Sequence, residues 1–196
     1  MANLDVDINA DRVVVFTRLI EAPRELVWRV WTSPEHVAAW WGPPGCENFD
    51  CEIDLRVGGA FRLKMLAPNG EIYPCAGRFV EVDPPHRLVI AGDDDIEHAC
   101  GAGLPPGARV MLSLEEAGGK TALTLKTLFD TAAARQAANA QGYSTSWPPC
   151  LERMAEFVSV QKSDRIMSPA IRTSLWFDGN GSEATCRGGR RTPSGS

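Results

Sequence analysis

The stretch FDCEIDLRVGGAFRLKM, residues 49–65, decides the fold. Apolar side chains occupy every second position on both sides of the pair Gly58-Gly59, and mostly charged residues stand between them. A period of two residues predicts strands with one buried and one solvated face, and the glycine pair predicts a tight turn between them. The stretch therefore predicts an antiparallel hairpin whose buried face carries Cys51, Ile53, Leu55, Val57, Phe61, Leu63 and Met65.

More strands surround this hairpin along the chain. Turn signals such as Pro68-Asn69-Gly70 and Asp83-Pro84-Pro85 separate further segments that alternate or are rich in β-branched and aromatic residues. These segments are residues 12–20, 71–82, 86–90, 108–116 and 120–129. Together with the hairpin they predict an antiparallel sheet of about six to seven strands in meander order.

Two short helices are predicted between the first strand and the hairpin. Pro23 suits the first turn of one helix, and Ser33 is a good N-cap for the other. The second helix must end near Trp40 and Trp41, because the Gly-Pro-Pro-Gly sequence of residues 42–45 cannot continue a helix.

A long helix is predicted to close the domain. Ser146 is its expected N-cap, since Pro148 and Pro149 would then fall in the first turn, where backbone N–H groups need no partner. Its apolar face comprises Leu151, Met154, Ala155 and Val158. A shorter helical piece, capped by Asp130 or Thr131, precedes it. Helices segregated from an antiparallel meander indicate the α+β class.

Charge and hydropathy narrow the possible partners. The formal net charge is −5 and the sequence has no cluster of five or more basic residues, which argues against nucleic acid or an anionic membrane as a partner. The first twelve residues are acidic where a signal peptide needs a basic start, and no apolar run reaches membrane-spanning length. We therefore expect a cytoplasmic protein without membrane insertion.

Known catalytic and cofactor motifs are not found. The six cysteines form no C-x-x-C pair, so buried reduced thiols are expected rather than a metal site. The three histidines, His36, His86 and His98, fall in turns or at a helix start, where surface positions are usual. The acidic stretch of residues 92–107 is expected to be a solvated loop. No catalytic residue, metal or cofactor is predicted.

Five motifs in order resemble a known family. They are EAPRELVWRVWTSPEHVAAWWGP, FDCEIDLRVGGAFRLKM, GRFVEVDPPHRLVI, GGKTALTLKTLF and WPPCLERMAEFV. Together they resemble homologues of the C-terminal domain of the heat-shock-protein-90 ATPase activator, in the START-like (SRPBCC) superfamily. The resemblance covers about residues 12–160.

This resemblance implies a helix-grip fold, in which a curved sheet wraps around the C-terminal helix and leaves an apolar cavity. It implies a ligand site whose rim and lining are Trp40, Trp41, Ile53, Leu55, Phe61, Leu63, Trp147, Leu151 and Met154. Two interpretations of the adjacent tryptophans stay open. They stand as a lid or rim where the cavity opens, or they plug the core, as large aromatic side chains usually do.

The expected domain boundaries follow from the same resemblance. Residues 1–11 are expected to be an N-terminal extension, 12–160 the START-like domain, and 161–196 a linker and tail. Within that tail, residues 169–185 resemble the first strand and helix start of a PhnB-like domain of the glyoxalase superfamily. We expect a second domain truncated by a frameshift and without activity, which sequencing of the gene locus would test.

Three functions remain open on sequence grounds. The first is a binding module for a small apolar or amphipathic ligand held between the sheet and the closing helix. The second, by analogy with the family name, is a chaperone-associated interaction protein. The third is a cyclase or hydrolase that uses the same cavity, which needs a titratable group turned inward. The strand residues that offer one are Asp54, Glu71, Glu81, Arg62 and Arg78.

Overall fold

The computed structural model describes residues 10–94 and 103–174 of the chain, with side chains up to Ser163. The chain divides into two units after Ser163; in the second, residues 164–174 are helical. The elements are η1 (Ala10–Arg12), β1 (Val13–Ile20), α1 (Arg24–Thr32), α2 (Pro34–Trp40), β2 (Glu47–Ile53), β3 (Ala60–Leu66), β4 (Ile72–Asp83), β5 (Arg87–Gly92), β6 (Arg109–Ala117), β7 (Lys120–Leu128), α3 (Ala132–Ala140) and α4 (Tyr143–Ser174).

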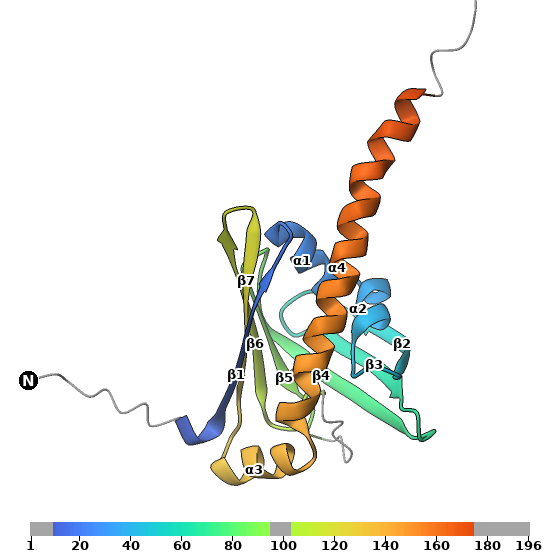
Figure 1. Cartoon of the computed structure of the whole chain (residues 1–196). Helices are drawn as coiled ribbons and strands as arrows, with labels where there is room; N and C mark the ends of the chain where they lie inside the picture. Colours follow the sequence, from blue (N-terminus) through green and yellow to red (C-terminus); the bar gives the residue numbers. More distant parts are fainter. Residues whose placement is uncertain (1–9, 95–102, 175–196) are drawn as a thin grey trace, which may run out of the picture. The chain divides into compact units, whose positions relative to one another are not determined.

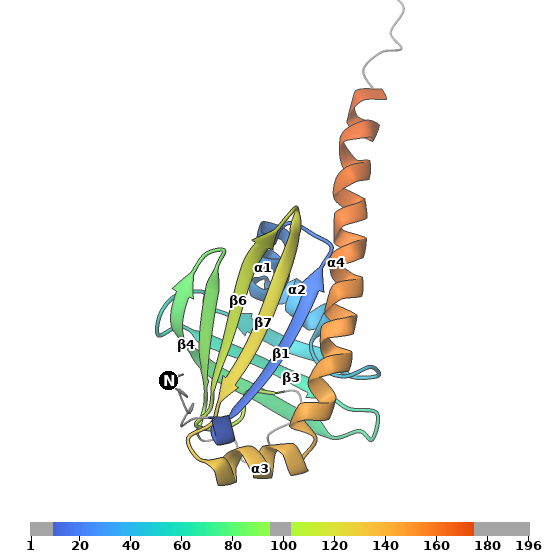
Figure 2. The same ribbon diagram turned by 60° about the vertical axis from the view of Figure 1, so that its left-hand side comes forward.

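One antiparallel sheet carries all seven described strands, in the order β1-β7-β6-β5-β4-β3-β2. Strands β2 to β7 follow the predicted meander, and β1 joins the far side by pairing with β7, with Phe16 opposite Leu125. Figures 1 and 2 show the sheet curving so that its two edges, β1 and β2, lie on either side of α4. This arrangement confirms the expected helix-grip fold and its α+β class.

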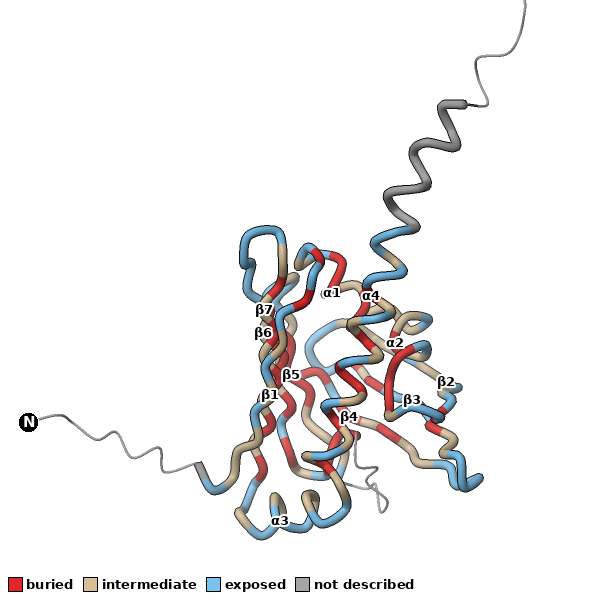
Figure 3. The backbone as a smooth tube through the Cα atoms, in the orientation of Figure 1, coloured by how far each residue is buried: buried red, intermediate tan, exposed pale blue. Residues whose placement is uncertain are grey.

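The core lies between the concave face of the sheet and the helices. Every second residue of β7, from Thr121 to Thr127, is buried, as the alternation requires. One side of α4 is buried against this face, as helical periodicity predicts, at Tyr143, Trp147, Cys150, Leu151, Met154 and Val158. Figure 3 shows the buried residues gathered on the facing sides of the sheet, α1, α2 and α4.

The first strand of the predicted hairpin ends earlier than the alternation of the sequence predicts. Strand β2 ends at Ile53, and Val57 is 63% exposed instead of buried. The cause is a turn over residues 54–59, in which the N–H of Arg56 bonds the Asp54 carbonyl and the N–H of Gly58 bonds the Phe79 carbonyl. The period of two continues through this turn by chance, so placing Val57 in the core was wrong.

Helix α4 begins earlier than predicted. It starts at Tyr143, after the Gly142 carbonyl accepts bonds from the N–H groups of Thr145 and Ser146. Pro148 and Pro149 therefore lie in the second turn, where each removes one intrahelical hydrogen bond. We infer that burial of the Tyr143 and Trp147 rings compensates this loss, so Ser146 as the N-cap was wrong. The N-cap positions of the other helices are Pro23 before α1, Ser33 before α2, as predicted, and Thr131 before α3. The Thr131 side chain accepts a hydrogen bond from the Ala134 N–H, whereas the Ser33 side chain makes no capping bond.

Several predictions concern segments that the structure does not describe. Residues 95–102 of the acidic loop lie outside the described residues, with His98 and Cys100 among them. Residues 175–196 also lie outside them, so the PhnB-like resemblance and the domain boundaries stay predictions. In the part of the chain that is described, no helix is both long and apolar enough to cross a membrane.

Candidate functional site

Helices α1 and α2 bring three tryptophans into contact beneath the sheet. Trp31 lies near the end of α1, and Trp40 and Trp41 lie at the end of α2. The centroid of the Trp31 ring is 4.7 Å from that of Trp40 and 6.1 Å from that of Trp41, in edge-to-face geometry. Such contacts between aromatic rings contribute about 0.5–1.5 kcal/mol each beyond the area they bury.

Helix α4 and strand β3 complete this cluster. Trp147 of α4 stacks on Trp31 at 6.3 Å and meets Trp41 edge-on at 5.4 Å. Phe61 of β3 lies 5.1 Å from Trp41. We call Trp31, Trp40, Trp41, Trp147 and Phe61 the aromatic cluster. It joins two short helices, the sheet and the closing helix at one place in the core.

The turn after α2 holds the cluster in position. Gly42 has φ +89°, and a Cβ there would stand 2.3 Å from the Met65 sulfur, so only glycine fits without rearrangement. The Asn48 side chain donates to the carbonyls of Ala38 and Trp41, at 2.9 and 2.7 Å. These bonds satisfy two of the carbonyls that the end of α2 leaves unpaired.

Both adjacent tryptophans lie in the core. Trp40 is 0% and Trp41 1% exposed, so neither ring lies at the surface of the described structure. Adjacent side chains within a helix point about 100° apart, so two neighbouring rings do not both face the same buried side. This limit does not apply to Trp41, because Trp41 is the C-cap of α2 and its backbone, with φ −59° and ψ 138°, is no longer helical.

The four indole N–H groups of the cluster are not equivalent. Trp40 donates to the Val30 carbonyl at 3.0 Å. The buried Nε1 atoms of Trp31, Trp41 and Trp147 have no acceptor among the described residues. A buried donor without a partner costs about 1–3 kcal/mol. Because three such donors lie in one group of neighbouring rings, this part of the core has fewer hydrogen-bond acceptors than donors among the described residues.

A hydroxyl pair lies next to the cluster. Tyr143 of α4 and Thr127 of β7 are both buried, and their oxygens are 2.6 Å apart. Burial raises the pKa of Tyr143, and the Thr127 hydroxyl opposes that shift. The Trp147 N–H also acts on the Tyr143 oxygen and lowers its pKa, but it makes no hydrogen bond of acceptable geometry.

The structure distributes the predicted site residues unevenly. Phe61, Leu63, Trp147, Leu151 and Met154 are buried with the two tryptophans of α2, whereas Ile53 and Leu55 are half-buried against the same core. Sequence reasoning missed Trp31 as a cluster member and the Tyr143–Thr127 pair. The buried face of α1 signalled Trp31, but the hydroxyl pair joins distant segments and left no local signal.

The charged strand residues do not turn into the core. Asp54 and Glu81 are half-buried, and Glu71, Arg62 and Arg78 are exposed. Glu81 pairs with Arg87 at 3.0 Å, and Arg62 with Glu52 at 3.5 Å. The inward titratable group that the enzyme hypothesis needs is not among these five side chains.

The described cysteines are buried or half-buried thiols. Cys46, Cys75 and Cys150 are buried, Cys51 is half-buried, and no disulfide joins these four described residues. Burial raises the pKa of Cys51 to about 11, which leaves little thiolate for reaction or metal binding at neutral pH. Within the described ranges, no group of three or more His, Cys, Asp or Glu side chains is placed to hold a metal ion.

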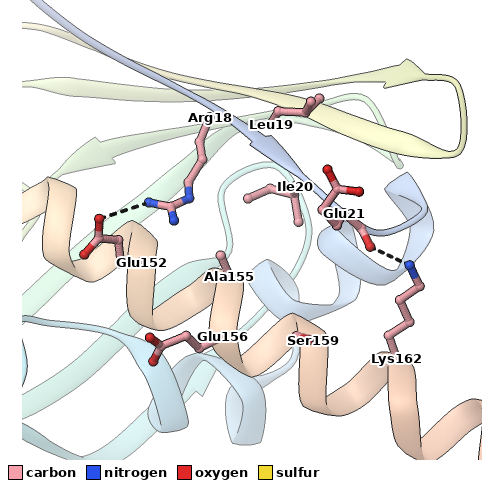
Figure 4. A pocket seen from close by; sticks show the side chains of 9 residues that line it. All are labelled: Arg18, Leu19, Ile20, Glu21, Glu152, Ala155, Glu156, Ser159 and Lys162. Carbon is pink, nitrogen blue, oxygen red and sulfur yellow. Dashed lines mark hydrogen bonds and ion pairs between the residues drawn. The ribbon is translucent and has the colours of Figure 1, made fainter.

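A groove of about 470 Å³ runs between β1 and α4. As Figure 4 shows, Arg18 and Glu152 face each other across one part of it, and Lys162 reaches Glu21 at another. The ion pair measures 3.7 Å, and the Lys162 ammonium donates to the Glu21 carbonyl at 2.7 Å. Ile20 lines the groove and is a core residue that is 2% exposed. The groove therefore reaches from the surface to the edge of the core.

Comparison with known proteins identifies the family. The family model described as Activator of Hsp90 ATPase homolog 1-like protein matches residues 21–159. The chain belongs to this family. That match spans the cluster, the hydroxyl pair and the part of α4 that packs on the sheet. None of the curated proteins matches the chain.

Solved structures of several bacterial proteins share the fold of this chain. A Nitrosomonas europaea protein is 26% identical, covers 80% of this chain and 99% of its own, and has a TM-score of 0.69. A Rhodobacter sphaeroides protein is 24% identical, with coverage of 78% and 95% and a TM-score of 0.66. An AHSA1-like protein from Aeromonas hydrophila is 24% identical, with coverage of 76% and 94% and a TM-score of 0.57. These likenesses support the helix-grip architecture.

Proposed function

We propose that this chain is a binding module that takes a small, largely apolar ligand into the core between the sheet and α4. The observation that carries the proposal is the set of three buried indole N–H groups that make no hydrogen bond among the described residues. A folded core rarely leaves several buried donors unpaired, so each one calls for an acceptor that the described residues do not supply. A ligand with an apolar body and an acceptor atom meets that need.

The surroundings of the three donors suit such a ligand. Ligand sites are mostly apolar and aromatic with a few placed polar groups, and the aromatic cluster with its N–H groups has that composition. Family membership supports a ligand-binding helix-grip domain in general. We propose that the ligand enters through the groove between β1 and α4. The Arg18–Glu152 ion pair and the Lys162–Glu21 hydrogen bond that cross the groove involve exposed or partly exposed side chains, and Ile20, which lines the groove, belongs to the core.

Matched tryptophan variants test this function. Trp31→Phe and Trp41→Phe each remove a donor that lacks an acceptor, whereas Trp40→Phe removes the same atoms but a donor already bonded to Val30. We expect native mass spectrometry of gently purified protein to show a bound small molecule. Occupancy should fall in the first two variants and persist in Trp40→Phe.

The ligand can also be supplied during the test. Prodan, an uncharged naphthyl ketone, should show blue-shifted emission on binding, with an affinity about fivefold lower for Trp41→Phe than for Trp40→Phe, as loss of one hydrogen bond predicts. A bare mass together with no prodan response in the wild type would remove the proposal.

A chaperone partner is the second candidate function. The observation that favours it is the family match, whose description names an activator of the Hsp90 ATPase. Purified chain should then raise the ATPase rate of the host's Hsp90 homologue, measured with inorganic phosphate release. No stimulation and no co-purification of the two proteins would exclude this function.

A further inference from the structure

We infer that the ligand of this core is an uncharged molecule that offers a hydrogen-bond acceptor, such as a ketone, ester or quinone oxygen. This inference rests on the proposed function and specifies its ligand class. It combines two observations: the chemistry of the unpaired groups, and the charge of the side chains around them.

The unpaired groups are donors only. An indole N–H donates one hydrogen bond and accepts none, so Trp31 and Trp41 require acceptors, and the Trp147 N–H has, among the described residues, only the Tyr143 oxygen near it, with which it makes no hydrogen bond. Their rings are mutual neighbours, at centroid distances of 5.4 to 6.3 Å. A ligand whose polar atoms are donors would leave all three N–H groups unpaired. An acceptor oxygen among the rings satisfies at least one of them.

No charged side chain among the described residues is fully buried in the core. Among the described residues, the buried side chains classed as polar or charged are Thr121 and Thr127. Thr121 donates to the Ala22 carbonyl at 2.7 Å, and Thr127 is bonded to Tyr143. A carboxylate would enter without a cationic partner, and the cost of removing an unpaired ion from water exceeds what neutral N–H donors return. The acceptor is therefore neutral.

A cationic ligand needs separate consideration, because tryptophan faces attract cations. Such a ligand would stack on the rings but would leave the three N–H groups without acceptors. The two modes make opposite predictions. Cation–π binding favours an ammonium compound over a ketone of the same size, and acceptor binding favours the ketone.

Four small probes with one phenyl ring separate these cases. Acetophenone carries a neutral acceptor, ethylbenzene carries no polar atom, benzoate is an anion at neutral pH, and benzylamine is a cation. Their dissociation constants for the full chain are measured by isothermal titration calorimetry. Acetophenone should bind about five- to thirtyfold tighter than ethylbenzene, as one or two added hydrogen bonds predict. Both ions should bind more weakly than ethylbenzene.

The variants link this preference to the named donors. In Trp31→Phe and in Trp41→Phe, the ratio of acetophenone to ethylbenzene affinity should fall by about fivefold, as expected for loss of one hydrogen bond, and Trp40→Phe should keep the wild-type ratio. Near-UV circular dichroism confirms that each variant is folded. A ratio is insensitive to a general loss of affinity, so a loosened core does not imitate the effect.

Each outcome has one meaning. If none of the probes binds, the proposed function fails. If ethylbenzene binds as tightly as acetophenone, the core takes ligands but the acceptor inference is overturned. Tighter binding of benzoate or benzylamine than of acetophenone overturns the inference that the ligand is uncharged.

Discussion

At the scale of single residues, Trp40 and Trp41 are equally buried but differ in one hydrogen bond. Trp40 donates to the Val30 carbonyl and is satisfied within the fold, whereas the Trp41 N–H has no acceptor among the described residues. Burial therefore does not distinguish a structural tryptophan from a ligand-contacting one in this core. The hydrogen bonding of the indole N–H does distinguish them, and on this ground we propose Trp41, and not Trp40, as a ligand contact.

Tyr143 gives a prediction at the same scale. Burial raises its pKa above the ordinary value of 10.0, so the folded chain keeps the phenol proton at a pH where the unfolded chain has lost it. The unfolded state then binds fewer protons than the folded state, and stability must fall as pH rises above about 10. Below that pH the stability that Tyr143 contributes is fully present.

Urea denaturation between pH 8 and pH 11 measures this loss. Tyr143→Phe should flatten the alkaline fall in unfolding free energy and should cost about 1 kcal/mol at neutral pH, because Thr127 loses its partner. Tyr73→Phe removes the other tyrosine of the chain, so a comparison of the two variants shows which phenol carries the fall. An unchanged pH profile in Tyr143→Phe would show that this tyrosine does not carry the effect.

At the scale of elements, short connections set the positions of the rings. Helix α2 ends where Trp41 turns out of the helix, and Gly42 lets the chain pass over Met65. Arg153 of α4 donates to the Cys46 carbonyl at 3.1 Å and ties this connection to the closing helix. The geometry of the aromatic cluster thus depends on the turn between α2 and β2 as much as on the helices.

Gly42→Ala tests this dependence against a matched glycine. Gly42 and Gly58 both have positive φ, at +89° and +81°, but a Cβ at Gly58 meets nothing within 4 Å. Gly58→Ala should cost about 1–2 kcal/mol from the backbone alone. Gly42→Ala should cost about 1–3 kcal/mol more, because buried Met65 must repack. Equal unfolding free energies of the two variants in urea would contradict this view of the turn.

At the scale of the whole molecule, sequence patterns predicted the elements better than the site. Alternation predicted the strands, and helical spacing predicted the buried face of α4, because both patterns record which side of an element faces the core. The same pattern misplaced Val57, since the hydrogen bonds of a turn decide where a strand ends. The stacking of Trp147 on Trp31 and the missing indole acceptors arise from atomic positions in distant segments. No local pattern encodes them.

The most direct test of the central claim observes the indole N–H groups themselves. A ¹H–¹⁵N correlation spectrum resolves the indole signals of the six tryptophans, and the phenylalanine variants assign them. On saturation with acetophenone, at least one of the signals of Trp31, Trp41 and Trp147 should move downfield, as expected for a new hydrogen bond, while the Trp40 signal stays in place. A shift at Trp40 as large as the others, or no shift at any of the four, would contradict the account.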